Sequence, residues 1–376
     1  MDKLLTMQRG GRLAGYTAFR AVGFPRLLPM NLTVSVTYNC PSRCATCDIW
    51  QKTVEDLRPD EYVKIFRSLG HAPMWVTVSG GDQFIRADLP QVFGLIREML
   101  RPSVINLPMN GIITNRIETL LPQIAKNTQG SSLVCNLSID DLGERHDVIR
   151  GATHNYEKII RTYGFLRELQ KEYPHVTVGI HTVISKFNVD RIPEIYTELK
   201  KLNPDSYITE VAENRVELGT MVKDITPTPD QYAKAADFLM EKMREKRSKH
   251  PTGRLIESLR LEYYDLVKRV LREKTQVIPC YAGWASAHLA PDGNVWGCCI
   301  RAESMGNVRD TDYDFGKVWF SGEAERFRKS VKNKECACPL ANASYTNLLL
   351  DAPSLARVAA NMAGLDALVP RRKDHA

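Results

Sequence analysis

The chain has 376 residues, of which 25% are charged and 43% are apolar, and its formal net charge is +7. These proportions exclude a disordered chain, and the length predicts one large domain with a smaller appendage. No stretch approaches the roughly 20 apolar residues of a membrane-spanning helix, and the N-terminus lacks the apolar region of a secretory signal, so we expect a cytoplasmic protein. The basic excess is mild, and no nucleic-acid partner is expected.

Residues 1–30 form a basic N-terminal arm in which apolar residues alternate with arginines such as Arg9 and Arg20. The pattern is compatible with an amphipathic helix that makes peripheral contact with a membrane, or with an arm that lies across the main domain. Gly10, Gly11 and Gly15 weaken the helical interpretation, because glycine disfavours helix interiors.

Residues 31–226 alternate short β-rich runs with longer helical runs, six times in succession. The predicted strands are 32–38, 75–80, 103–111, 132–140, 176–185 and 205–211. The predicted helices between them are 59–69, 88–100, 116–125, 156–171 and 191–202. Such alternation predicts an α/β fold of parallel strands with right-handed crossovers, and six units predict a partial (β/α)6 barrel like part of a TIM barrel. Its site is expected at the carboxyl ends of the strands.

A cysteine-rich loop follows the first predicted strand, where CPSRCATC contains Cys40, Cys44 and Cys47. Three thiolates can bind three irons of a [4Fe–4S] cluster, and no fourth cysteine follows nearby, so the fourth iron stays open. An open iron can chelate S-adenosylmethionine (SAM), whose reductive cleavage releases a 5′-deoxyadenosyl radical that abstracts a substrate hydrogen. A zinc site or three buried free thiols is the alternative interpretation.

The C-x3-C-x2-C spacing of this loop, placed after the first barrel strand, resembles the signature of the radical SAM superfamily. The resemblance implies a SAM-binding [4Fe–4S] cluster and an external reductant such as flavodoxin or ferredoxin. Thr46 departs from the family pattern, because many members have an aromatic residue immediately before the third cysteine. Tyr38 or Trp50 could supply that aromatic surface.

Glycine-containing motifs follow the second and third predicted strands. Gly80, Gly81 and Asp82 resemble the glycine–glycine–acid motif of the family, which receives the methionyl amino group of the cofactor. On its own, such a tripeptide is more often a turn, and its place one βα unit after the cysteine loop is what favours the cofactor role. The pair Asn110-Gly111 resembles another family element and is equally a good turn.

Polar residues on the fourth and fifth predicted strands extend the resemblance. By that resemblance, Ser138 contacts the ribose or carboxylate of the cofactor, and Arg150 pairs with its carboxylate. His181 faces the barrel interior and is a candidate contact of adenine or substrate, with a buried core histidine as the alternative.

Charged residues follow the sixth predicted strand in the sequence EVAENRVELG. Glu210, Glu213 and Arg215 are therefore candidates for substrate binding at the barrel mouth, or else solvated surface charges.

Residues 227–275 interrupt the alternation with two charge-rich helical runs, which predict a helical bridge to a further domain at 276–350. In that domain Cys280 precedes a predicted hairpin that ends in Cys298 and Cys299, and Cys336 and Cys338 follow in ECACPL. The Asp-Gly turn of the hairpin brings its two ends together. Residues 351–376 are expected to form one helix and a charged tail.

This C-terminal arrangement resembles the twitch or SPASM extension of radical SAM enzymes, in which a β-hairpin and a helix enclose an auxiliary [4Fe–4S] cluster. The resemblance implies one such cluster with Cys280, Cys298, Cys336 and Cys338 as ligands and Cys299 as a spare or substitute. The single residue between the last two cysteines departs from the usual spacing, which leaves the ligand set open. Four thiolates also suit zinc.

The combined motifs predict a radical SAM oxidoreductase whose auxiliary cluster exchanges an electron during dehydrogenation or coupling of a substrate. A small-molecule, sugar or lipid substrate is the first hypothesis. Only about thirty residues precede the first strand, with no additional peptide-recognition domain, so a peptide maturase of the SPASM type is the second. A non-catalytic iron–sulfur or zinc protein is the third.

Overall fold

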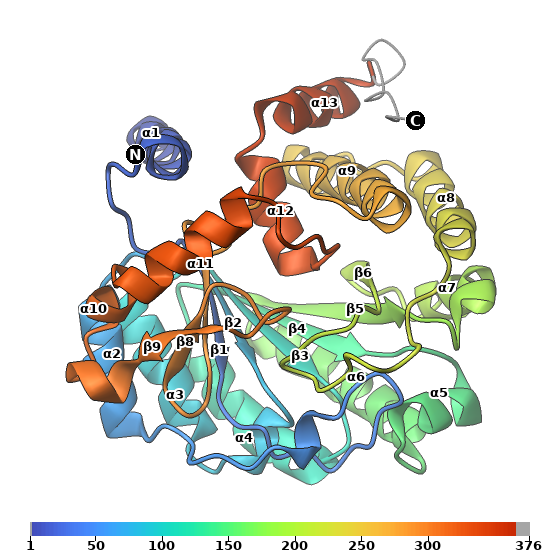
Figure 1. Ribbon diagram of the computed structural model, residues 1–376. Helices are drawn as coiled ribbons and strands as arrows, with labels where there is room; N and C mark the ends of the chain where they lie inside the picture. Colours follow the sequence, from blue (N-terminus) through green and yellow to red (C-terminus); the bar gives the residue numbers. More distant parts are fainter. Residues whose placement is uncertain (1, 366–376) are drawn as a thin grey trace.

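One sheet of nine strands runs through the structure, a computed structural model that describes residues 2–365 (Figure 1). The strands are β1 Asn31–Ser35, β2 Trp75–Ser79, β3 Val104–Met109, β4 Ser132–Ser138, β5 Val176–Ile184, β6 Ser206–Val211, β7 Ser286–Leu289, β8 Asn294–Trp296 and β9 Ser304–Asn307. Their order is β6-β5-β4-β3-β2-β1-β7-β8-β9. Neighbours from β6 to β7 pair in parallel, and β7, β8 and β9 pair antiparallel.

Helices join the successive parallel strands, and the six units form the partial, open barrel that the sequence predicts. These helices are α2 Pro59–Leu69, α3 Leu89–Leu95, which continues into a π-helical turn at Ile96–Leu100, α4 Thr114–Asn127, α5 Gly143–Arg150, α6 Asn155–Glu172 and α7 Ile192–Lys200. In α2 the buried residues Tyr62, Ile65, Phe66 and Leu69 follow the spacing that places side chains on one helix face. That face packs into the main hydrophobic core together with the strands.

The predicted strand and helix positions of the barrel are confirmed, with small shifts at their ends. The first strand ends at Ser35 instead of residue 38. Its continuation begins with a bond of 3.0 Å from the backbone N–H of Val36 to the carbonyl of Ser79 and then runs into the cysteine loop.

The N-terminal arm is a continuous helix, α1 Asp2–Val22, so the expectation that its glycines weaken a helix was wrong. Tertiary packing overrides the propensity, because Tyr16 and Phe19 are buried in the main core. The Tyr16 hydroxyl donates to the carbonyl of Leu28 at 2.5 Å, Arg12 donates to the carbonyl of Ala72, and Arg20 donates to that of Cys280 at 2.9 Å. The arm therefore lies across the main domain. Arg9 falls outside the residues whose side chains are described.

The C-terminal part combines helices with the antiparallel strands. Its helices are α8 Pro229–Glu245, α9 Pro251–Glu273, α10 Phe315–Trp319, α11 Gly322–Lys332, α12 Ala341–Leu349 and α13 Ala352–Ala363. Because β7 pairs with β1, the predicted hairpin extends the barrel sheet, and α12 and α13 pack beside α9 (Figure 1). The charged tail predicted after α13 lies outside the described residues. None of the described helices is long and apolar enough to cross a membrane.

Candidate functional site

The first cysteine loop leaves the carboxyl end of the β1 region and is held from two sides. The backbone N–H of Ala45 donates to the carbonyl of Ile149 at 2.8 Å, and that of Asp48 donates to the carbonyl of Leu218 at 2.8 Å. Cys40, Cys44 and Cys47 are all partly buried in this loop. Burial raises the pKa of the Cys40 thiol, and it raises the pKa of the Cys47 thiol to about 12. Burial therefore disfavours the thiolate forms of Cys40 and Cys47, which a bound cation would stabilise.

The glycine–glycine–acid motif lies directly against the start of the cysteine loop. The N–H of Gly81 donates to the carbonyl of Thr37 at 2.7 Å, and the N–H of Asp82 donates to that of Asn39 at 2.8 Å. A Cβ atom at Gly80 would lie 2.2 Å from the Thr37 oxygen, and one at Gly81 would lie 2.2 Å from the Asn39 oxygen. The backbones can approach this closely only because both residues are glycine.

Asp82 joins this motif to the end of β3. Its Oδ2 accepts a hydrogen bond of 3.1 Å from Nδ2 of Asn110, and its Oδ1 accepts one of 3.1 Å from the N–H of Phe84. Burial raises the pKa of Asp82, although these two bonds act in the opposite direction. The two motifs that the sequence placed after β2 and β3 thus form one hydrogen-bonded unit.

Arg150 connects the end of β4 to the cysteine loop. It donates through Nη2 to the carbonyl of Ser138 at 2.9 Å, and its Nε lies 3.1 Å from Oδ2 of Asp140. Its Nη1 lies 3.9 Å from Sγ of Cys44. The guanidinium therefore already has a carboxylate partner within the protein, which sequence reasoning did not anticipate.

The charged residues after β6 meet His181 of β5. Nη2 of Arg215 lies 3.5 Å from Oε1 of Glu210 and 3.3 Å from Oε1 of Glu213, and His181 lies 3.8 Å from Oε1 of Glu210. Glu213 is 8% exposed, and neither of its carboxylate oxygens has a geometrically good hydrogen bond among the described residues. Burial raises its pKa to about 8. Glu213 is buried and the other three residues are partly buried, so the group does not consist of solvated surface charges.

The second group of cysteines lies around the antiparallel strands, before β7 (Cys280), after β8 (Cys298) and after α11 (Cys336, Cys338). Burial raises the pKa of Cys280, of Cys338 and of Cys298, the last to about 12, and other cysteines of the group raise each of them further. The four thiols therefore lie close enough to interact electrostatically. Gln276 directs its Nε2 toward Sγ of Cys336 at 3.9 Å.

A single zinc ion requires a compact set of ligands, because bonds of about 2.3 Å to four thiolates in a tetrahedral site place the sulfurs about 3.8 Å apart. Within residues 2–365, the group of three ligand atoms from Cys, His, Asp or Glu that all lie within 4.8 Å of one another is formed by Glu217, His288 and Cys299. No three sulfurs of either cysteine group are that close together in the described residues. A cubane binds each thiolate through a different iron and therefore accepts a wider spacing than one zinc ion.

The segment between β6 and α8 links the two cysteine regions, a connection that strand–helix patterns do not reveal. Its Val216 N–H donates to the carbonyl of Ile300 at 2.9 Å, beside the second group. Lys223 donates to Oδ1 of Asp48 at 2.7 Å, beside the first. One loop thus connects both candidate cluster sites.

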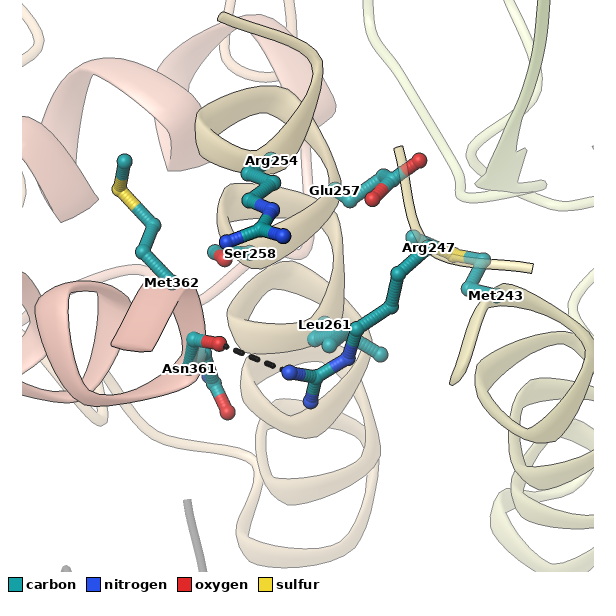
Figure 2. A pocket seen from close by; sticks show the side chains of 8 residues that line it. All are labelled: Met243, Arg247, Arg254, Glu257, Ser258, Leu261, Asn361 and Met362. Atoms are coloured by element: carbon teal, nitrogen blue, oxygen red, sulfur yellow. Dashed lines mark hydrogen bonds between the residues drawn. The ribbon is translucent and has the colours of Figure 1, made fainter. Parts of the chain in front are cut away.

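A separate small pocket lies between α9, α13 and the end of α8 (Figure 2). Its lining residues are Met243, Arg247, Arg254, Glu257, Ser258, Leu261, Asn361 and Met362. Arg247 donates to the carbonyl of Asn361 at 3.3 Å across it. None of the residues predicted to be functional lines this pocket, so the cysteine-bearing loops remain the candidate site.

Comparisons with known proteins match both parts of the chain. The model of the radical SAM superfamily matches residues 34–199, and that of the SPASM iron–sulfur cluster-binding domain matches residues 280–339. The antilisterial bacteriocin subtilosin biosynthesis protein AlbA of Bacillus subtilis is 20% identical over 346 residues, 88% of this chain and 70% of AlbA. A "Probable GTP 3',8-cyclase" of Methanococcus maripaludis is 26% identical over 243 residues, 61% of this chain and 74% of that protein.

Solved structures share the fold. Streptococcus suis SuiB bound to S-adenosylmethionine aligns with a TM-score of 0.60 at 12% identity, over 94% of this chain and 80% of SuiB. Native anSMEcpe with bound AdoMet aligns with a TM-score of 0.59 at 15% identity, over 90% of this chain and 100% of anSMEcpe. The matched family models show that this chain belongs to the radical SAM superfamily and is an S-adenosylmethionine-binding enzyme with [4Fe–4S] clusters and a SPASM domain.

Proposed function

We propose that Cys40, Cys44 and Cys47 bind the [4Fe–4S] cluster that coordinates SAM. The observation that carries this proposal is the convergence of the cysteine loop, the glycine–glycine–acid motif and Arg150 at the carboxyl ends of β1, β2 and β4. When bound, the cluster supplies the electron that cleaves SAM to a 5′-deoxyadenosyl radical. Flavodoxin or ferredoxin is the proposed source of that electron.

The residues beside this loop are proposed to hold SAM. Gly80 and Gly81 allow their backbone to lie against the cysteine loop, beside the cofactor, and Asp82, fixed by Asn110, keeps their turn in place. Ser138 and His181, at adjacent positions on β4 and β5, are proposed to contact the nucleoside. Glu210, Glu213 and Arg215 extend from the same edge and are proposed to face the substrate.

Cys280, Cys298, Cys336 and Cys338 are proposed to bind one auxiliary [4Fe–4S] cluster in a domain at 276–350, with the barrel at 31–226 and the helical bridge at 227–275. With four thiolate ligands the cluster has no open iron, so it suits electron transfer better than substrate binding. Its proposed role is to accept an electron from the substrate radical during dehydrogenation or coupling. A cluster that carries electrons suits oxidoreductase chemistry on a substrate bound in the barrel.

A peptide is the proposed substrate, so the order of the two substrate hypotheses drawn from the sequence is reversed. AlbA, a bacteriocin biosynthesis protein, matches 88% of this chain, and SuiB and anSMEcpe have been seen with a precursor peptide and with Cp18Cys peptide. A small molecule, sugar or lipid is the second candidate, favoured by the GTP-cyclase relative.

The cellular setting of this chemistry is proposed to be the cytoplasm. All nine cysteines are free thiols, which suits a reducing compartment. Because Arg12 and Arg20 of α1 bond to the protein itself, peripheral membrane contact is not part of the proposal.

Anaerobic reconstitution tests the enzyme proposal. The wild type is expected to hold about eight irons per chain and to form 5′-deoxyadenosine from SAM after reduction. Cys40→Ala, Cys44→Ala and Cys47→Ala should each abolish that product, whereas Cys135→Ala, at a buried cysteine of β4, should retain it. Undiminished product from a loop variant would contradict the assignment, and so would a reconstituted wild type that forms none.

A second experiment tests the substrate. Short peptides encoded by genes adjacent to this one, and separately GTP and amino sugars, are incubated with holoenzyme, SAM and reductant. Stimulated 5′-deoxyadenosine formation with loss of two hydrogens from a peptide supports the peptide proposal. The same result with a small molecule alone replaces it with the second candidate.

A further inference from the structure

A buried group of three chemically different metal ligands lies beneath the segment that links the two cysteine regions. Glu217 belongs to that segment, His288 to β7 and Cys299 to the turn after β8. They are 6%, 4% and 9% exposed, and their ligand atoms all lie within 4.8 Å of one another. Three separate parts of the chain thus converge on one point in the protein interior.

The closest pair in this group has the spacing of two ligands on one ion. Nε2 of His288 lies 3.2 Å from Oε1 of Glu217. Zinc bonds of about 2.0–2.2 Å to nitrogen and oxygen place two tetrahedral ligands about 3.4 Å apart. Ser35 completes the surroundings, because its hydroxyl lies 2.8 Å from Nε2 of His288 and donates to Oε1 of Glu217 at 3.1 Å. A hydroxyl bonded to a ligating carboxylate is the usual support of such a ligand.

The adjacent cysteines 298 and 299 face different neighbours. Cys298 packs against the main core, as Cys280 and Cys336 do, whereas Sγ of Cys299 lies within 4.8 Å of the ligand atoms of Glu217 and His288. Cys299 is therefore directed toward the linking segment. The ring of Trp296 covers His288 at 4.8 Å between centroids, which excludes water from this side of the group.

We propose that Glu217, His288 and Cys299 bind one divalent ion of intermediate softness, such as Zn²⁺ or Fe²⁺, at a third metal site. Mixed carboxylate, imidazole and thiolate ligands suit these ions. Binding releases the thiol proton of Cys299 to solvent, and the ion balances two anionic ligands in the protein interior. The ion cross-links β7, the turn after β8 and the linking segment. The site does not depend on the proposed substrate or on SAM cleavage.

Metal analysis of the reconstituted holoenzyme tests this site. The protein is equilibrated with Zn²⁺, passed over a weak chelating resin and analysed for zinc, iron and sulfide. The wild type is expected to retain one zinc in addition to about eight irons. Glu217→Gln, His288→Gln and Cys299→Ala should each lower zinc at least tenfold and leave iron and sulfide unchanged. Cys135→Ala, the matched cysteine control, should retain the zinc.

Co²⁺ in place of Zn²⁺ gives a second measurement on the same proteins. A tetrahedral Co²⁺ ion with a thiolate ligand absorbs visible light at about 600–700 nm. Cys299→Ala should remove that band. Three results overturn the proposal: a wild type that retains no stoichiometric zinc, zinc that survives all three substitutions, or loss of about four irons in Cys299→Ala. The last result would make Cys299 an auxiliary-cluster ligand. Circular dichroism checks that each variant is folded. If His288→Gln is unfolded, the zinc content of Glu217→Gln, whose side chain keeps the shape of glutamate, decides the test.

Discussion

Nη1 of Arg150 lies 3.9 Å from Sγ of Cys44, so a permanent positive charge from the end of α5 reaches a proposed ligand of the first cluster. Two further contacts fix the guanidinium and the chain next to it. Asp140 pairs with Nε of the same guanidinium at 3.1 Å, and the C-cap residue Gly151 fits against the cysteine loop, where a Cβ would lie 2.1 Å from the carbonyl of Arg43. Hydrogen bonds to cluster sulfurs and nearby charge are two of the terms that set a cluster's reduction potential.

Replacing Arg150 by glutamine should make the first cluster harder to reduce. Loss of a buried positive charge beside Cys44 destabilises the reduced, more negative cluster, so its midpoint potential should become more negative. A redox titration followed by electron paramagnetic resonance, without SAM, measures the shift. Arg161→Gln is the control, because Arg161 is an exposed cation of α6 that pairs with Glu118. Equal potentials in wild type and Arg150→Gln would leave Arg150 with a purely structural or cofactor-binding role.

Gly81→Ala should prevent assembly of the first cluster. Its Cβ would lie 2.2 Å from the carbonyl oxygen of Asn39, a contact with backbone that no side-chain rotation can relieve. Iron after reconstitution should fall from about eight to about four per chain, because only the auxiliary site remains intact. Gly164→Ala, in α6 with no atom within 4 Å of the added Cβ, should keep the full iron content. A Gly81→Ala protein with normal iron would show that the loop can move away.

The local patterns of the sequence predicted the strand–helix units, the cysteine loop and the hairpin, because hydrophobic period and cysteine spacing operate within a few residues. They did not predict that Asp140 pairs with Arg150 or that His288 meets Glu217, which are 71 residues apart in sequence (288 − 217). The contact of His288 with Glu217 depends on which strands become neighbours, here β7 beside β1. The Asp140–Arg150 pair depends on how α5 folds back onto the end of β4, where Arg150 also bonds to Ser138. The same reason explains α1, whose glycines are tolerated because Tyr16 and Phe19 find a core that is formed by distant segments.

The barrel and the C-terminal part are joined by an ion pair between the buried Glu61 of α2 and the partly exposed Arg309. Burial raises the pKa of Glu61, but hydrogen bonds from Arg309, from the Arg58 N–H and from Tyr313 outweigh it and lower the pKa to about 2. Nε of Arg309 lies 2.8 Å from Oε1 of Glu61, whose side chain is 2% exposed.

Arg309→Ala should therefore destabilise the protein by about 2–3 kcal/mol, since it removes the closer of the two cations beside a buried carboxylate and leaves Arg58 at 3.7 Å. Thermal or denaturant unfolding of the holoprotein measures the change. Arg161→Ala, which removes an exposed pair with Glu118, should cost less than about 1 kcal/mol. If the two substitutions cost the same, the Glu61–Arg309 pair does not hold the two parts together.

Glu213 should give the protein a pH-dependent stability that glutamine removes. Burial raises the pKa of Glu213 from 4.5 to about 8, so the folded state keeps a proton that the unfolded state releases above about pH 4.5. The stabilisation that this protonated carboxyl gives the folded state is fully present below about pH 4.5 and is lost as the pH rises to about 8. Over that range the free energy of unfolding falls by no more than about 1.4 kcal/mol per pH unit. Glu213→Gln should therefore be more stable than the wild type at pH 8, by a margin that shrinks toward pH 5.

Apparent melting temperatures of anaerobic holoprotein at both pH values measure this margin, and Glu241→Gln, on the exposed face of α8, should show none. A margin independent of pH would mean that Glu213 is already ionised in the folded protein, held by Arg215.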